Sequence, residues 1–352
     1  MAIDPNALTL AEWAHLSNDP LVLKITESLH KTLNILQDIP FVTDETMSMK
    51  GFRYIDNLPG VNWGQINKAP VVTKGKPTPY EEAAFLIRNQ FQIDKRLLNN
   101  KNNITNPMQS EVDMFMEALT YELNYRFIAN DPTDTVNGNV DAWQGLASRI
   151  SNSQIPTELN IDGSASALGP INITQAQLSS TTPTVAATAG NQFIEAVQSM
   201  LDFMNAPEGD GVVFYCNDLL KRRWERAIRA MGAGSGFDIT RDAFDRPIAM
   251  YKNAKVRDVG RRVDQVTRVI TSNEKANGSL GVVGTDDYTS LYAVRYGDGY
   301  FKGWQTNPLK PDNLGVDPTN GIMINLVVDW GSGLWQQHNR SVCRLHGILI
   351  SP

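Results

Sequence analysis

Residues that commonly carry out chemistry are few and scattered in this sequence. Asp210 stands alone and Asp286-Asp287 form a pair in turn-like sequence, where a carboxylate more often supports the turn than acts as a general acid or base. The histidines lack the H-x-x-x-H and H-E-x-x-H spacings that place two imidazoles on one helix face for a metal ion. There are four of them: His15, His30, His338 and His346. We therefore expect no catalytic and no metal-binding residue.

One glycine-rich segment has the composition of a phosphate-binding loop. It is Gly232-Ala-Gly-Ser-Gly236, and it follows a predicted helix instead of opening one after a strand. Its backbone N–H groups are therefore not presented at a helix N-terminus, where they would bind phosphate. Ser235 also lacks the longer G-x-S-x-G spacing of a hydrolase nucleophile. We interpret the segment as a loop and expect no cofactor.

The two cysteines, Cys216 and Cys343, are far apart and neither belongs to a C-x-x-C pair. The sequence thus predicts buried free thiols and neither a disulfide framework nor a zinc cluster.

Composition and charge narrow the class of protein. The chain has 352 residues, 41% of them hydrophobic and 20% charged, which is typical of a folded globular protein of about two domains. The formal net charge of -6 argues against a dedicated nucleic-acid binder. One predicted helix carries a basic face, interpreted as a solvated or subunit-facing surface. Its residues are Lys221, Arg222, Arg223, Arg226 and Arg229.

The sequence also lacks the features of an exported or membrane protein. No run approaches the roughly 20 apolar residues that cross a bilayer. The N-terminal sequence MAIDPNALTL has neither the basic region nor the apolar core of a secretory signal. The prediction is synthesis in a cytosol, without a membrane partner.

The longest helical signal runs from residue 107 to 129. Asn106 is a suitable N-cap before Pro107, and the helix would span roughly 35 Å. Its apolar residues fall in two adjacent stripes, so we expect both sides to be covered. The first stripe is Val112, Phe115, Met116, Leu119, Leu123 and Phe127; the second is Met114, Ala118, Tyr121 and Tyr125.

Two segments before this helix have little core of their own. Residues 1–45 form an arm with amphipathic helical pieces, and residues 46–100 form an oversized hairpin between the strand-like runs at 49–60 and 85–98. A middle this long is unusual in a compact domain, so we interpret it as an arm that reaches a neighbouring molecule. The candidate contact residues are Trp63, Lys68, Lys74, Lys76, Glu81 and Glu82. A solvated charged surface is the alternative interpretation of these charges.

A compact α/β pattern follows the long helix. A polar stretch at 151–190 predicts short strands and loops, and helix 191–205, strand 211–216 and helix 217–232 come next. Short strands continue to the C-terminus, where two apolar strands are expected on either side of the break Gly331-Ser-Gly333.

This order of elements resembles the major capsid protein of tailed bacteriophages, the HK-ninety-seven-like fold. The matching texts are AWQGLASRI after the long helix, NQFIEAVQSMLDFMN with GVVFYCNDLLKRRWERAIRAMG, then RPIAMYKNAKV, SLYAVRYGDGY and RSVCRLHGILI. The resemblance implies an α+β fold with an N-terminal arm (1–45), an extended hairpin called the E-loop (46–100), and a P-domain (101–189) whose spine helix is 107–129. It also implies a compact A-domain (190–318), a return strand to the P-domain (319–337) and a terminal A-domain strand (338–352).

The function implied by the resemblance is structural. Hexamers and pentamers of the chain would assemble into an icosahedral head around double-stranded DNA, without sequence-specific binding. Portal, scaffolding and cement proteins are the further partners implied, and the location implied is the virion capsid after synthesis in the bacterial host cytoplasm. Two alternatives stay open: an encapsulin-like nanocompartment shell, and an α/β enzyme with an unrecognised site.

Overall fold

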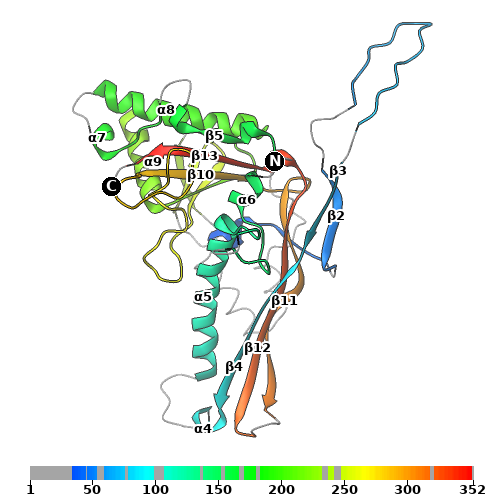
Figure 1. Ribbon diagram of the computed structural model, residues 1–352, viewed down its shortest axis with the longest axis vertical. Helices are drawn as coiled ribbons and strands as arrows, with labels where there is room; N and C mark the ends of the chain where they lie inside the picture. Colours follow the sequence, from blue (N-terminus) through cyan, green and yellow to red (C-terminus); the bar gives the residue numbers. More distant parts are fainter. Residues whose placement is uncertain are drawn as a thin grey trace.

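The computed structural model describes twelve segments of the chain: residues 34–44, 46–53, 59–75, 78–98, 107–134, 138–151, 155–165, 170–179, 183–231, 237–241, 247–317 and 321–350. Residues 1–33 of the predicted arm (1–45), with His15 and His30, lie outside them, as does the glycine-rich segment 232–236. The described residues form an upper α/β unit, an elongated lower unit and a hairpin that projects from the side (Figure 1).

The upper unit is built on a seven-stranded mixed sheet with the order β5-β13-β10-β6-β9-β8-β7. Its central strand β6 is parallel to β9 and antiparallel to β10. The strands are β5 (Asn160–Asp162), β6 (Val212–Cys216), β7 (Phe237–Arg241), β8 (Pro247–Tyr251), β9 (Ala254–Asp258), β10 (Tyr288–Arg295) and β13 (Val342–Leu349). All five residues of β6 are buried, as expected for a strand covered on both faces.

Two helices, α8 (Pro183–Phe203) and α9 (Asp218–Met231), pack on this sheet. Trp224 of α9 is fully buried, with its ring 5.1 Å from Phe193 of α8 and 5.5 Å from Phe214 of β6. Asn217 accepts a 2.7 Å hydrogen bond from the Leu220 N–H, so it caps the start of α9. A single aromatic cluster therefore joins both helices to the sheet.

The lower unit contains the long helix and a four-stranded sheet. Helix α5 (Pro107–Ala129) covers the predicted range, and the sheet order is β1-β11-β12-β4. Its strands are β1 (Phe41–Thr43), β4 (Phe85–Asp94), β11 (Phe301–Val316) and β12 (Met323–Gln336). Short helices complete the fold: α3 (Asn34–Asp38), α4 (Lys95–Leu98), α6 (Leu146–Ile150) and α7 (Gln175–Leu178), with single 3-10 turns at Thr157–Leu159, Gly163–Ala165 and Asn339–Ser341.

The faces of α5 follow the prediction only in part. Val112, Met116, Leu119, Leu123 and Phe127 are buried and Phe115 is half-buried. In the second stripe Met114 and Ala118 are exposed, while Tyr121 and Tyr125 are half-buried. The expectation of two covered sides is therefore wrong for the N-terminal half of the helix, which packs on one side and faces outward on the other.

The segment before β1 is tied to the upper sheet by a buried carboxylate. Asp38, at the end of α3, accepts hydrogen bonds from Arg257 Nε at 3.0 Å and Lys255 Nζ at 3.1 Å, both on β9. Its side chain is buried, so two cations compensate its charge where water cannot. This contact joins α3, which precedes the four-stranded sheet, to the seven-stranded sheet.

Four further sequence-based expectations are wrong. The run at 85–98 does not close the hairpin, since β4 pairs with β12 and ends in α4. Strand β11 lies in the four-stranded sheet, although the expected compact unit extended to residue 318. Helix α8 begins at Pro183, inside the stretch expected to form strands and loops.

The fourth correction concerns Gly331-Ser-Gly333, which does not break the chain. Strand β12 continues through it, and the break before β13 falls at residues 337–341. A Cβ at Gly333 would lie 2.4 Å from the Trp304 ring. These glycines therefore permit the close approach of a neighbouring strand and its side chains.

Candidate assembly surface

The hairpin begins with a short two-stranded sheet. Strand β2 (Ser48–Arg53) pairs antiparallel with β3 (Thr78–Ala83), in register from Ser48–Ala83 to Arg53–Thr78. The described tip, residues 59–75, extends away from both units (Figure 1). It contains neither helix nor strand. The projecting arm predicted from the sequence is therefore present, but its stem pairs 48–53 with 78–83.

Local hydrogen bonds give the tip its shape. The Thr73 hydroxyl donates to the Gly60 carbonyl at 2.9 Å, which joins the two limbs of the loop. The Lys68 N–H donates to the Gln65 carbonyl at 3.2 Å, and Asn67 adopts a left-handed φ of 68° at the turn, where asparagine is well tolerated. The tip is thus a defined loop that makes no core of its own.

Its apolar side chains face solvent. Trp63, Ile66 and Val72 are each at least 95% exposed, and Val61 is 86% exposed. Burying one such side chain gains roughly 1.5–3 kcal/mol. Exposed apolar side chains gathered on one projecting loop mark a contact with another molecule. Of these residues only Trp63 was among the predicted contacts; the signal for the others is an apolar residue in a loop that has no core.

The predicted contact residues fall into three groups. Trp63, Lys68 and Lys74 are exposed on the tip. Lys76 lies outside the described residues. Glu81 and Glu82 lie on β3 in the stem, where Glu81 forms an exposed ion pair with Lys50 at 3.4 Å.

Glu82 has a different environment, because it forms a buried ion pair within the chain. Arg149 Nη1 bonds to Glu82 Oε1, and Arg149 Nη2 lies 3.3 Å from Oε2. The side chains of Arg149 and Glu82 are only 4% and 9% exposed, and Tyr80 also donates its hydroxyl to Glu82. Burial alone would lower the pKa of Arg149, but the charge of Glu82 raises it. The sequence alone does not indicate this pair, because its members are 67 residues apart.

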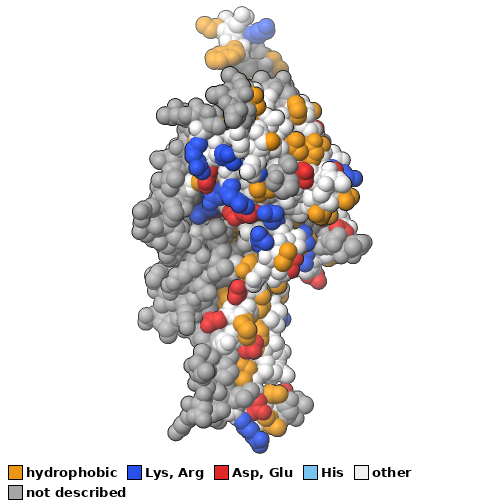
Figure 2. Space-filling view, turned by 90° about the vertical axis from the view of Figure 1, so that its left-hand side faces the viewer, with side chains coloured by type: hydrophobic (Ala, Val, Ile, Leu, Met, Phe, Trp, Pro, Cys, Tyr) orange, Lys and Arg blue, Asp and Glu red, His pale blue; other side chains and the backbone are white. Residues whose placement is uncertain are grey.

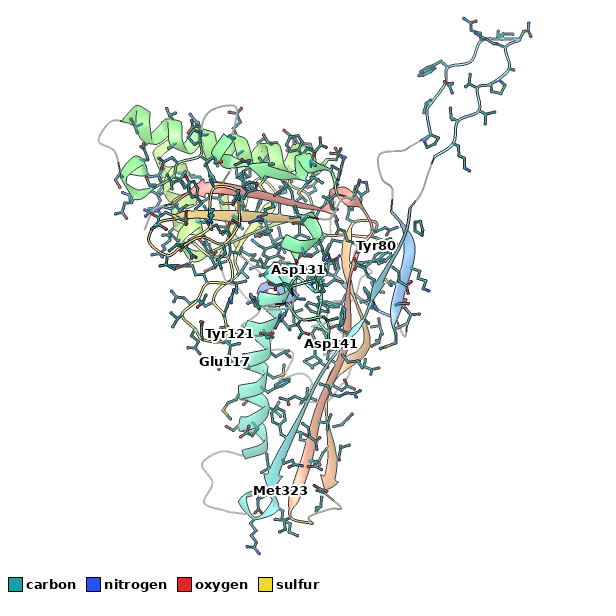
Figure 3. All side chains as sticks on the ribbon, in the orientation of Figure 1. Tyr80, Glu117, Tyr121, Asp131, Asp141 and Met323 are labelled. Carbon is teal, nitrogen blue, oxygen red and sulfur yellow. The ribbon has the colours of Figure 1, made fainter. Side chains whose placement is uncertain are left out.

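Aromatic packing fixes the stem at the same place. The Tyr80 ring lies 5.5 Å from the Trp335 ring of β12, and Figure 3 shows Tyr80 at the base of the projecting hairpin. A Cβ at Gly51 would lie 2.7 Å from the same indole, so only glycine allows β2 this close. Among the described residues, the hairpin therefore has a stem anchored to the body and a tip that projects away from it.

The two cysteines and His338 have structural environments. Both cysteines are buried free thiols, as predicted, and burial raises the pKa of each. His338 caps the turn at 339–341 by accepting the Arg340 N–H at 3.0 Å. Among the described residues no group of three His, Cys, Asp or Glu side chains could hold a metal ion. No described helix is long and apolar enough to cross a membrane.

Known proteins resemble this chain in its fold and in part of its sequence. Residues 17–167 match the family described as major capsid protein GP7. No curated protein matches the sequence. The family match covers less than half of the chain, so the remainder is compared through structure.

Three solved structures are similar to this chain over about nine-tenths of its length. The encapsulin of the holo-SrpI complex from Synechococcus elongatus has a TM-score of 0.52 and 10% identity, covering 89% of this chain and 86% of its own. The Mycobacterium phage Bobi structure has a TM-score of 0.51 and 11% identity, and the capsid of a native GTA particle has 0.50 and 12%. Each of these last two matches covers 91% of this chain and 91% of the other chain. The chain thus has a mixed α+β fold of the HK-ninety-seven-like capsid type.

Proposed function

We propose that this chain, with its capsid-type fold and its match to the major capsid protein family, is the major capsid protein of a tailed bacteriophage. Its role is structural. Many copies self-assemble as hexamers and pentamers into an icosahedral head that encloses double-stranded DNA. The exposed apolar tip carries this proposal, because Trp63 and its apolar neighbours on residues 59–75 have no partner surface in the described part of the chain.

Each part of the fold has its own proposed role in the shell. The hairpin 46–83 acts as the E-loop, with its tip on the next subunit and its stem on its own. The unit built from α5 and the four-stranded sheet acts as the P-domain, and the seven-stranded unit as the A-domain. Trp63, Lys68 and Lys74 are the proposed tip contacts, whereas Glu82 serves within the subunit, since Arg149 already neutralises it.

The tip needs a partner for an energetic reason. Four side chains of this size, if buried, would gain roughly 6–12 kcal/mol before the entropy of ordering the loop is subtracted. In a closed symmetric shell the same contact repeats, so every equivalent position contributes this stabilisation. Specific interfaces bury roughly 1,200–2,000 Å², so the tip supplies one part of a larger contact.

A cargo-enclosing shell is the second candidate, favoured by the similarity to the SrpI encapsulin structure. Both candidates predict the same self-assembly, and they differ in content. A phage head encloses DNA and has portal, scaffolding and cement proteins as further partners, while a nanocompartment encloses protein. The head is preferred because the family match is to a major capsid protein.

The experiment is expression of the full chain in a bacterial host, followed by sedimentation, electron microscopy and nuclease treatment. We expect megadalton particles, or pentameric and hexameric capsomers that close on concentration. Co-expression with the phage packaging genes should yield nuclease-resistant DNA inside the particles. A monomer at every protein and salt concentration would contradict the proposal, and particles that fill only with protein would favour the nanocompartment.

A further inference from the structure

A groove on the seven-stranded unit is lined by arginines. It has a volume of about 850 Å³ and lies between α9 and the loops before β10. Figure 2 shows the Lys and Arg side chains gathered on this side of the molecule. The guanidinium groups come from Arg222, Arg223, Arg226, Arg229 and Arg268. For a chain with a net charge of -6, this is a local reversal of sign.

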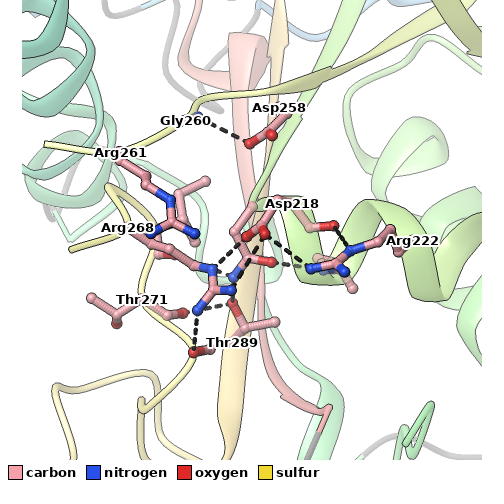
Figure 4. A network of polar contacts seen from close by, with 12 residues as sticks. Asp218, Arg222, Asp258, Gly260, Arg261, Arg268, Thr271 and Thr289 are labelled. Carbon is pink, nitrogen blue, oxygen red and sulfur yellow. Dashed lines mark hydrogen bonds and ion pairs between the residues drawn. The ribbon is translucent and has the colours of Figure 1, made fainter. Parts of the chain in front are cut away.

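Carboxylates within the chain compensate these arginines unequally. Asp218 bonds to Arg222 Nη2 at 3.0 Å and to the guanidinium of Arg268, as Figure 4 shows. Arg229 has only a 3.8 Å surface contact with Glu225, and no described carboxylate forms an ion pair with Arg226. Burial, with the nearby charges of Arg226 and Arg222, lowers the pKa of Arg223. Positive charge therefore remains toward the C-terminal half of α9.

The complementary charge is in the same unit. Between residues 150 and 220 the sequence has seven Asp and Glu residues and no Lys or Arg. Three of the seven are exposed in the last turns of α8 and the loop after it, and no ion pair links them to a described basic side chain. They are Glu195, Asp202 and Glu208. We call these three residues the acidic surface.

Glu208 of the acidic surface and the groove lie at opposite ends of one strand. Glu208 precedes β6, and Arg222 follows it in the first turns of α9. A five-residue strand spans roughly 17 Å, so one chain cannot bring its Glu208 to its own groove around this rigid strand. Two copies in head-to-tail order can join the two surfaces, and such heterologous contacts close into rings.

The groove lies on a side of the molecule where a neighbouring copy could bind. Figure 1 views the molecule down its shortest axis, and Figure 2 is the view from the side, onto an edge. In a shell one subunit thick, flat faces point inward and outward and edges meet neighbours. The groove walls also include Leu219, Val283 and Ile350, which suit a protein surface better than a phosphate backbone.

We infer that the arginine groove of one subunit binds the acidic surface, Glu195, Asp202 and Glu208, of the next copy within a ring. This inference rests on the proposed self-assembly and names one of its contacts. The pairing adds specificity, because opposite charges meet in the correct order and like charges meet in the reverse order.

The test is charge reversal on each surface and on both together. The groove variant is Arg226→Glu with Arg229→Glu, which leaves the Asp218 network intact. The acidic-surface variant is Glu195→Lys, Asp202→Lys and Glu208→Lys. Each alone should reduce the yield of closed particles roughly tenfold or more, and the chain carrying all five should recover them. Neutral Arg226→Gln with Arg229→Gln should give an intermediate loss.

Circular dichroism melts keep folding separate from assembly, since each variant is compared with the unsubstituted subunit. Wild-type particle yield from either reversed variant would overturn the pairing, as would failure of the combined variant to recover particles while it melts normally. A groove variant that assembles normally but loses salt-sensitive binding to a short DNA duplex would assign the groove to nucleic acid instead. If the unsubstituted chain forms no particles, the proposed function fails first.

Discussion

Glu82 of the hairpin stem and Arg149 of α6 form a buried ion pair that joins the projecting hairpin to the body of the subunit. The two residues are 67 positions apart, and both side chains are almost fully enclosed. Because the pair sits beside the Tyr80–Trp335 contact, it sets the point from which the tip projects.

Removing one member of this pair should be costly. In Glu82→Gln the Arg149 guanidinium stays buried without its counter-charge, which typically costs roughly 3–5 kcal/mol. The free energy of unfolding from denaturant titration measures this loss. The neighbouring Glu81→Gln, whose pair with Lys50 is exposed, should change it by at most about 0.5 kcal/mol. Equal effects from the two substitutions would mean that the Glu82 pair is not buried in solution.

The long helix gives a second matched pair. Leu119 is buried on α5, so Leu119→Asp places an unpaired charge in the core at a cost of several kcal/mol, out of the roughly 5–15 kcal/mol that stabilises a domain. Glu117 is exposed, and Figure 3 shows it on α5 beside Tyr121. Glu117→Lys should therefore change stability by no more than about 0.5 kcal/mol. Soluble yield and thermal melts compare the two, and similar damage from both would show that the helix faces are assigned wrongly.

The glycine of β12 tests the close approach of neighbouring strands. Gly333→Ala would place a methyl group 2.4 Å from the Trp304 ring, so the core must shift, at a cost of roughly 1–3 kcal/mol. The control is Gly64→Ala on the tip, where a Cβ meets nothing within 4 Å. Thermal denaturation should show a lower Tm for Gly333→Ala only. An unchanged Tm would indicate that β12 does not run straight past Trp304.

The raised pKa of Glu274 predicts that the stability of the fold depends on pH. Burial raises the pKa of its carboxyl group to about 7, although Arg344 at 3.3 Å and a hydrogen bond from Ser290 oppose the shift. A folded-state pKa above the unfolded value of 4.5 means that the folded protein binds the proton more tightly. The contribution of Glu274 to stability is then fully present below pH 4.5 and is lost as the pH rises to about 7.

The matched variant for this prediction is Glu274→Gln, which cannot ionise. Its unfolding free energy should fall less than that of the unsubstituted protein between pH 4.5 and 7. Denaturant titrations at several pH values measure the difference. Parallel pH profiles for the two proteins would show that Glu274 does not titrate in this range.

Local signals in the sequence predict the local structure well. Pro107 and the apolar stripe through Leu119 predict α5, and the helical pattern at 217–232 predicts α9. Non-local pairing is where prediction fails. β4 pairs with β12, between 229 and 247 positions later, and no property of residues 85–94 indicates that partner. The start of α8 at Pro183 was missed because a Ser-, Thr- and Ala-rich stretch has little apolar periodicity, and tertiary packing decides its structure.

The candidate surfaces also combine features that the local sequence predicts with features that only the fold creates. The projecting tip and its Trp63 follow from a loop too long and too poor in core for a compact domain. The role of Glu82 depends on Arg149, which the fold alone brings near. Similarly, the basic face of α9 is visible in the sequence, but the groove with Arg268 exists only because loops between β9 and β10 form its other wall.

The most direct test of the account replaces residues 59–75, the tip, with a short Gly-Ser turn. The shortened loop changes closure entropy by only about a kcal/mol, and the stem contacts of Tyr80 and Glu82 remain. Thermal melts by circular dichroism should match those of the unsubstituted subunit, because the tip contributes no core. Particle counts by electron microscopy should fall to few or no closed shells, because each subunit loses its contact with the next. Normal shells from the shortened chain, formed in wild-type yield, would contradict the claim that the hairpin tip holds the shell together.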